Sequence, residues 1–304
     1  MKRPNNGGQA SSMDIDPFES KRVNNFRDYL IKGIPKFPNN SETISELEKL
    51  SISGLLLYFF TWAYRFVPPR KRLVSVEYEV IKDKRWKTYS KEIGLLLGKV
   101  EEGEDLSAHL SLKAHKKGFT PRATQLGAEV DKWEDKDFLL TTMGYHHFHL
   151  SNELMENGAT VRTDDVLFSR VTRDTFEVVG IFNHSVFERN TKESPELNAE
   201  RKKLFRKFDE HTFRGHPPGT VVSGPMITTS GHALHVSEMA SNYAYVLIEA
   251  EKELLSNDGV GKLYAKHGIM EPNKPRLSWV IHGLDLGLFC NKSKSLFVYR
   301  YGPI

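Results

Sequence analysis

Apolar residues in the first third of the chain recur mostly at the three- and four-residue intervals of an amphipathic helix. Ile44, Leu47 and Leu50 show this spacing. The densest apolar run, residues 55–64, is far shorter than the roughly 20 residues that a membrane-spanning helix requires. The pattern therefore predicts a helical region over residues 24–125, with a buried helix where this run lies.

The middle of the chain is richer in β-branched and aromatic residues. Residues 166–172 and 175–182 have the composition of strands, and Arg173 and Asp174 form a short polar connection between them. Two such runs separated by a short polar turn predict an antiparallel hairpin. Residues 143–150, just upstream, are expected to add a third strand.

The last third alternates between helical and strand-like patterns. Residues 195–208 are highly polar and predict a surface helix, whereas residues 237–255 have apolar positions at helical spacing behind a Ser N-cap. Residues 221–236 favour a hairpin. Residues 278–290 and 295–301 are expected to form a terminal hairpin.

These elements predict an α+β fold. The first residues are rich in Asn, Gly and Ser and offer few large apolar groups, which is typical of a flexible tail. We expect a tail over 1–23, a helical region over 24–125, an antiparallel sheet domain over 126–190, and a C-terminal hairpin-helix-hairpin unit within 191–304.

Charge and cysteine content add little about partners but indicate a compartment. The chain has 43 Lys and Arg residues and 39 Asp and Glu residues, which gives a net charge of +4. This excess of positive charge is too small to predict nucleic-acid binding by itself. Cys290 is the single cysteine, so neither an intrachain disulfide nor a cysteine-based zinc site is expected. The N-terminus lacks the apolar segment of a secretory signal. We expect a cytoplasmic protein.

Histidines provide the strongest indication of chemistry. His146, His147 and His149 fall within four positions, and His184 follows at the end of the predicted hairpin. On a strand, His147 and His149 would share one face and His146 would lie on the other. If the three strands are neighbours, these imidazoles meet Arg162 at one end of the sheet.

Such a set of groups suits the cleavage of RNA by its own 2′-hydroxyl. One imidazole would remove the 2′ proton, a second would protonate the departing 5′ oxygen, and Arg162 would neutralise the phosphate. Phe187 or Tyr145 could hold a base by stacking, which contributes roughly 1–3 kcal/mol. This chemistry requires no metal and no cofactor.

The stretch from His149 to Phe187 resembles the second half of a RelE-superfamily ribonuclease toxin, particularly of the YafQ branch. The matching motifs are His149-Leu150, Asp164 or Asp165 before Val-Leu-Phe168, and Gly180-Ile-Phe-Asn-His184-Ser-Val-Phe187. The resemblance implies a catalytic or RNA-contacting role for His149, Asp164, His184 and Phe187, and it implies RNA or ribosome-associated RNA and a neutralising antitoxin-like protein as partners. Where the toxin pattern has a further histidine, this chain has Thr160 and Arg162.

Two other functions remain open at this point. His147, His149 and His184 could bind Zn²⁺ in a hydrolase, with Asp164 as a fourth ligand. The sheet could instead be the scaffold of a non-catalytic interaction protein, because a fold does not by itself confer activity. The wider pattern, which includes His146 to Leu150, also resembles a group of uncharacterised phage- and plasmid-associated bacterial proteins, which supplies no settled function. The leading hypothesis is a metal-independent ribonuclease of the RelE-like type that acts as a toxin or phage-defence effector.

Overall fold

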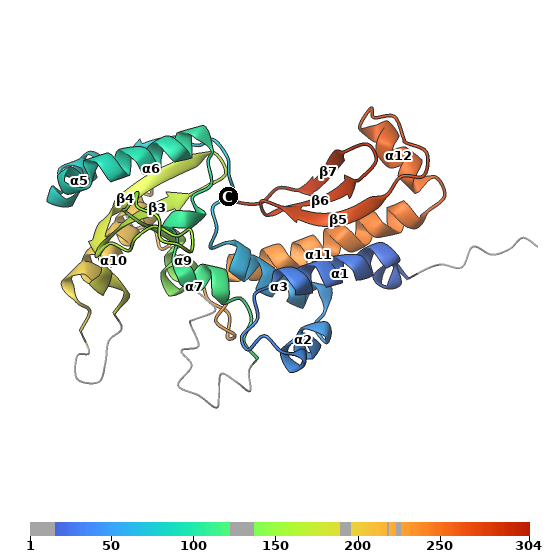
Figure 1. Ribbon diagram of the computed structural model, residues 1–304, viewed down its shortest axis with the longest axis horizontal. Helices are drawn as coiled ribbons and strands as arrows, with labels where there is room; N and C mark the ends of the chain where they lie inside the picture. The colour runs from blue at the N-terminus through green and yellow to red at the C-terminus, as the bar shows by residue number, and fades with distance from the viewer. Residues whose placement is uncertain (1–15, 122–136, 189–195, 218, 223–225) are drawn as a thin grey trace, which may run out of the picture.

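The protein has an α+β fold built on two sheets, as expected (Figure 1). A computed structural model describes residues 16–121, 137–188, 196–217, 219–222 and 226–304. Within these residues, none of the helices is long and apolar enough to cross a membrane.

The central sheet contains the predicted hairpin and its third strand. Its strand order is β1-β4-β3-β2, and β2, β3 and β4 are antiparallel neighbours. β3 and β4 pair Asp165 with Asn183 at one end, and β2 pairs His149 with Val166 near the same end. The strands are β1 (Leu73–Val76), β2 (Tyr145–His149), β3 (Asp165–Val171) and β4 (Thr175–Asn183).

Strand β1 corrects the expectation of a purely helical region over 24–125 and of a purely antiparallel sheet. It lies parallel to β4, with Leu73 beside Thr175 and Val76 beside Val178, so the sheet is mixed. Four residues are too few to show a clear period of two, and the strand depends on pairing with a partner about 100 residues away in the chain.

Helices cover both faces of this sheet. On one face, Ile93 and Leu96 of α6 belong to the same core as Phe148 and Leu167. On the other face, α9 and α10 contribute to a smaller core. The helices near this sheet are α4 (Tyr78–Ile81), α5 (Lys84–Thr88), α6 (Ser90–Glu102), α7 (Leu112–Lys116), α9 (Phe138–Met143) and α10 (Ala199–Phe213), with the short 3₁₀ helices η2 (Ser107–His109) and η3 (His184–Phe187).

The second unit combines the two ends of the described chain. Figure 1 shows the blue helices α1 and α3 beside α11 and the sheet β5-β6-β7. The elements of this unit are α1 (Lys21–Gly33), α2 (Ser41–Glu48), α3 (Ile52–Ala63), α11 (Leu234–Leu255), α12 (Gly259–Lys266), β5 (Leu277–His282), β6 (Asp285–Cys290) and β7 (Ser295–Arg300).

The expected tail over 1–23 is too long. Residues 1–15 lie outside the described residues, but η1 (Pro17–Glu19) and the start of α1 fall within that range. The Ser20 hydroxyl accepts a hydrogen bond from the Val23 amide at 3.1 Å, which caps α1. Val23 is buried, so this segment belongs to the core.

Two expectations for the last third also change. The hairpin over 221–236 is reduced, within the described residues, to a single bridge between Ile227 and Ala233, because α11 already begins at Leu234. Residues 278–290 form two strands, because the backbone reverses at Gly283 and Leu284 with φ of 53° and 71°. The terminal sheet therefore has three strands where a hairpin was predicted.

Candidate active site

A pocket of about 260 Å³ lies at the edge of the central sheet, beside β2. It combines histidines, basic side chains and one carboxylate with an apolar wall. The lining residues that matter for chemistry are Arg65, Lys113, Asp137, His146, His147, His149, Arg162, His184, Phe187 and Arg201.

Strand β2 supplies two of the predicted histidines, His147 and His149, to one face of the sheet. His147 packs against Phe168 and Phe187, whereas His146 lies on the opposite face and its Nε2 is 2.8 Å from the Tyr64 carbonyl oxygen. The alternation therefore follows the strand period. Because β2 is an edge strand, groups on both of its faces reach the same pocket.

His184 reaches the pocket through η3, which starts where β4 ends. The Asn183 side chain caps η3 by accepting a hydrogen bond from the Ser185 amide at 3.0 Å. The His184 amide donates to the Asp164 carbonyl at 2.7 Å, and the Asn198 side chain of the α10 N-cap donates to the Ser185 carbonyl at 2.7 Å. These bonds fix η3 between β3 and α10.

His149 and His184 form a stacked pair. Their ring centroids are 5.9 Å apart with an interplanar angle of 22°. His149 is 2% exposed, whereas His184 is exposed. The prediction that residues from β2 and from the end of β4 meet at one end of the sheet is confirmed.

Phe187 forms the apolar wall between the imidazoles. Its ring centroid is 4.7 Å from that of His147 and 4.9 Å from that of His184, and it stacks on Phe168 at 5.9 Å. Part of the Phe187 side chain remains exposed.

Burial makes His147 and His149 weak bases. Burial, with smaller contributions from the nearby His147, Arg162 and His184, lowers the pKa of His149 to about 4. Burial also lowers the pKa of His147, and the Asp137 carboxylate acts in the opposite direction. His149 is therefore neutral near pH 7.

Asp137 was not predicted as a site residue. It is the N-cap of α9, and its Oδ1 accepts a hydrogen bond from the Leu140 amide at 3.0 Å. Its Oδ2 lies 3.4 Å from Nδ1 of His147. The Asp-Phe-Leu-Leu pattern at 137–140 signals a helix start, but the sequence gives no indication that the carboxylate reaches a histidine on the next strand.

Three basic residues also line the pocket without having been predicted as site residues. Arg65 donates a hydrogen bond to the Lys117 carbonyl at 2.7 Å, and Arg201 donates to the Glu188 carbonyl at 2.6 Å. Lys113 and the exposed Arg162 complete the basic lining. Among the described lining residues, these basic side chains outnumber the carboxylates, of which there is one.

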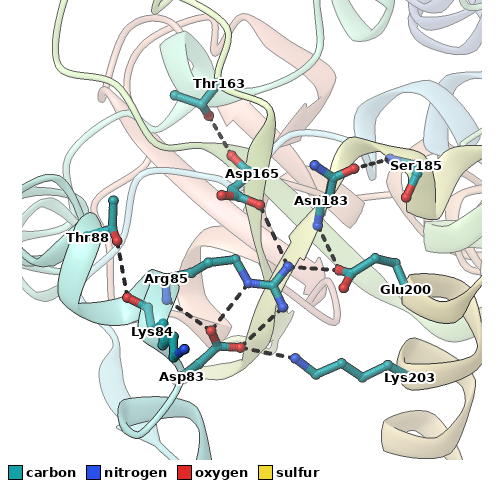
Figure 2. A network of polar contacts seen from close by, with 10 residues as sticks. All are labelled: Asp83, Lys84, Arg85, Thr88, Thr163, Asp165, Asn183, Ser185, Glu200 and Lys203. Carbon is teal, nitrogen blue, oxygen red and sulfur yellow. Dashed lines mark hydrogen bonds and ion pairs between the residues drawn. The ribbon is translucent and has the colours of Figure 1, made fainter.

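Asp165 lies outside the pocket, in a separate polar network. Figure 2 shows its carboxylate facing Arg85, and Asp165 Oδ1 lies 3.7 Å from Arg85 Nη1. The same guanidinium binds Asp83 at 3.2 Å and Glu200 at 2.9 Å. Asp165 thus ties β3 to α5 through Arg85, which also binds Glu200 of α10.

Asp164 and Tyr145 also lie away from the pocket lining. Asp164 contributes its carbonyl oxygen to the His184 amide, but its side chain is exposed. Tyr145 is 1% exposed, and its hydroxyl lies 2.9 Å from Nδ1 of His211 on α10. Tyr145 is therefore a core residue here and does not offer a ring to a ligand.

The pocket histidines do not form a ready-made metal site. Among the described residues, one group of three His or carboxylate ligand atoms lies within 4.8 Å of one another, and it consists of Glu77, Glu177 and His211. That group already holds Lys207 and Arg214 as ion-pair partners. The ligand set expected for zinc, with His147, His149, His184 and Asp164, is not assembled.

Comparison of the chain with models of known protein families, with curated proteins and with solved structures finds no match.

Proposed function

We propose that this protein is a metal-independent endoribonuclease that cleaves RNA through the RNA's own 2′-hydroxyl, and that it acts in the cytoplasm. The observation that carries the proposal is the meeting of His147, His149, His184 and Arg162 in one pocket. Two proton-exchanging groups and a cation near the phosphate suit this reaction.

His149 is the proposed general base. Since burial holds its pKa at about 4, its imidazole is neutral and able to accept the 2′ proton near pH 7. The 2′ oxygen then attacks phosphorus, and the bond between phosphorus and the 5′ oxygen breaks. A second imidazole, from His184 or His147, donates a proton to the departing 5′ oxygen. The products are a 2′,3′-cyclic phosphate and a 5′-hydroxyl.

Arg162 is the proposed phosphate ligand. It is exposed and lines the pocket beside the histidines. A guanidinium can donate two parallel hydrogen bonds to phosphate oxygens, and it stabilises the additional negative charge of the transition state. Phe187 is the proposed stacking surface for a base next to the cleaved bond.

The biological setting follows from the resemblance to RelE-superfamily toxins. A toxin or phage-defence effector would need a neutralising protein that covers the pocket or its approach. Both the setting and that partner belong to the proposal, as does ribosome-associated RNA as the substrate.

The proposal is tested by incubating the purified protein with RNA in the presence and absence of EDTA. We expect cleavage that resists EDTA and is abolished by the double substitution His149→Ala/His184→Ala. His282→Ala is the matched control, because His282 is exposed at the end of β5, away from the pocket, and the variant should cleave normally. EDTA-sensitive cleavage would instead support the zinc hydrolase, and a folded protein without activity would support the interaction scaffold.

A further inference from the structure

We infer that Asp137 is a positioning residue that directs Nδ1–H of His147 toward its carboxylate, and that this makes His147 the group that protonates the departing 5′ oxygen. The catalytic part of this inference rests on the proposed ribonuclease function. The geometric part, an Asp137–His147 dyad, stands on the contacts of the two side chains.

The carboxylate of Asp137 is held in a fixed orientation. Oδ1 accepts a hydrogen bond from the Leu140 amide at 3.0 Å, and the Asp137 carbonyl accepts another from the Thr141 amide at 2.8 Å. The first turn of α9 therefore anchors both the backbone and one carboxylate oxygen. Oδ2 is left to face Nδ1 of His147 at 3.4 Å.

Nδ1 of His147 has no better partner among the described residues. The atom is buried and makes no hydrogen bond of good geometry, while 11% of the side chain remains exposed. Leaving a buried polar atom unpaired costs about 1–3 kcal/mol, so a small approach of the two groups is favourable. A proton on Nδ1 then serves the carboxylate and leaves Nε2 to face a ligand. To act as the acid, His147 must react as the imidazolium, with a second proton on Nε2 that passes to the departing oxygen, and the Asp137 carboxylate favours this charged form.

Asp137 favours the protonated form of His147 against the effect of its other neighbours. His184 on η3 and Arg162 before β3 both disfavour an imidazolium at His147, as burial does, whereas Asp137 on α9 favours it. A carboxylate that orients an imidazole and stabilises its charged form is the arrangement that lets a histidine carry a proton during catalysis.

The position of His147 on β2 suits a division of roles with His149. The two residues are separated by one position on the same face of the strand, and their Cα atoms are therefore about 7 Å apart. Cleavage through the 2′-hydroxyl requires a base on one side of the phosphorus and an acid on the other. His149 with the stacked His184 can serve the 2′ side, and His147 the leaving oxygen.

The decisive variant is Asp137→Asn. Asn is as good an N-cap as Asp, so α9 should keep its start while the negative charge is lost. The first measurement is an NMR titration of the His147 ring in the full-length protein. We expect the pKa of His147 to fall and the share of the Nδ1–H tautomer to decrease in Asp137→Asn. Asp105→Asn, whose carboxylate accepts from the Ser107 amide outside the pocket, is the control and should leave His147 unchanged.

The second measurement uses two RNA substrates, one natural and one with a 5′ leaving group so acidic that it needs no protonation. For Asp137→Asn and His147→Ala we expect kcat on natural RNA to fall at least about tenfold with little change in KM, since general acid catalysis contributes roughly 10²–10⁴-fold. Both variants should recover near wild-type rates on the activated substrate, whereas His149→Ala should stay slow on both.

The two measurements separate the dyad from the proposed function. If the wild-type protein cleaves no RNA, the ribonuclease proposal fails, and the NMR titration still decides the dyad. An unchanged His147 pKa and tautomer in Asp137→Asn would overturn the dyad even if RNA is cleaved. Equal losses on both substrates would overturn the assignment of His147 as the acid. Asp137→Ser, which also caps a helix but is too short to reach His147, serves if the Asn variant does not fold.

Discussion

At the scale of single residues, burial determines which histidine can accept a proton. The ring of His149 lies beside His184 of η3 and the backbone of Thr163, and the His149 carbonyl oxygen accepts a hydrogen bond from Nδ1 of His109 at 3.0 Å. The low pKa that results could not be predicted from the sequence, because spacing along a strand does not reveal how much apolar surface will cover a ring. The clustering of His146, His147 and His149 could be predicted from the sequence.

The low pKa of His149 predicts the pH dependence of cleavage. A base must be deprotonated to act and an acid must be protonated, so kcat/KM should rise as the pH falls from 7 toward the lowered pKa of His147 and should decline only near the pKa of His149, about 4. The measurement is kcat/KM against pH over the range in which the protein remains folded. An acidic limb centred near 6.5, the ordinary value for histidine, would show that His149 is not the base.

Phe187 offers a second test at this scale. Replacing it with Leu removes the ring that lies between His147 and His184, so we expect RNA to bind roughly tenfold more weakly, since stacking contributes about 1–3 kcal/mol. Phe187→Trp keeps a stacking surface and should bind RNA better than Phe187→Leu. Equal affinity of the two variants for a short single-stranded RNA would exclude the stacking role.

At the scale of elements, the sequence predicted the strands whose pattern is local. The β3–β4 hairpin and β2 were expected from β-branched and aromatic runs with a polar turn, and the structure confirms them. β1 and η3 were not expected, because β1 is short and η3 depends on contacts with α10. The site needs η3, since this turn carries both His184 and Phe187.

The cap of η3 can be tested separately from the catalytic groups. Asn183→Ala removes the acceptor of the Ser185 amide and should cost about 1 kcal/mol of unfolding free energy. It should also lower the cleavage rate, because η3 then positions His184 less well. The comparison is Asn40→Ala, which removes the equivalent cap of α2, where the side chain accepts from the Thr43 amide at 2.9 Å.

The two cap variants should lose similar stability, measured by denaturant unfolding. Only Asn183→Ala should lose activity, measured on the same RNA. If Asn40→Ala loses as much activity, the effect follows from general destabilisation and not from the position of η3.

At the scale of the whole molecule, the order of regions along the chain differs from their arrangement in space. α1 and α3 come from the expected helical region and pack with α11 and β5, whereas β1 from the same region joins the central sheet. The bidentate pair of Arg173 with Asp285, at 2.7 and 3.0 Å, links the β3–β4 turn to β6. Contacts between residues so far apart in the sequence leave no periodic pattern of apolar positions, so they could not be predicted from the sequence.

Buried histidines also determine how the whole fold responds to acid. The pKa of His146 and of His149 is lowered to about 4 mainly by burial, so the unfolded chain binds protons more readily than the folded protein between pH 6.5 and 4. Stability should therefore fall as the pH decreases through that window, by about 2 kcal/mol for each histidine between pH 7 and pH 5. Denaturant unfolding at the two pH values measures the change, and equal stability at both would show that these rings are not buried as neutral groups.

The proposed reaction uses the 2′-hydroxyl of RNA as the nucleophile. The most direct measurement compares an RNA oligonucleotide with the same oligonucleotide carrying a single 2′-deoxy sugar at the cleaved position, with product ends identified by mass spectrometry. We predict that the RNA yields a 2′,3′-cyclic phosphate and a 5′-hydroxyl, and that the deoxy position resists cleavage. Equal cleavage of both oligonucleotides, or products with a 5′-phosphate and a 3′-hydroxyl, would exclude the 2′-hydroxyl as the nucleophile.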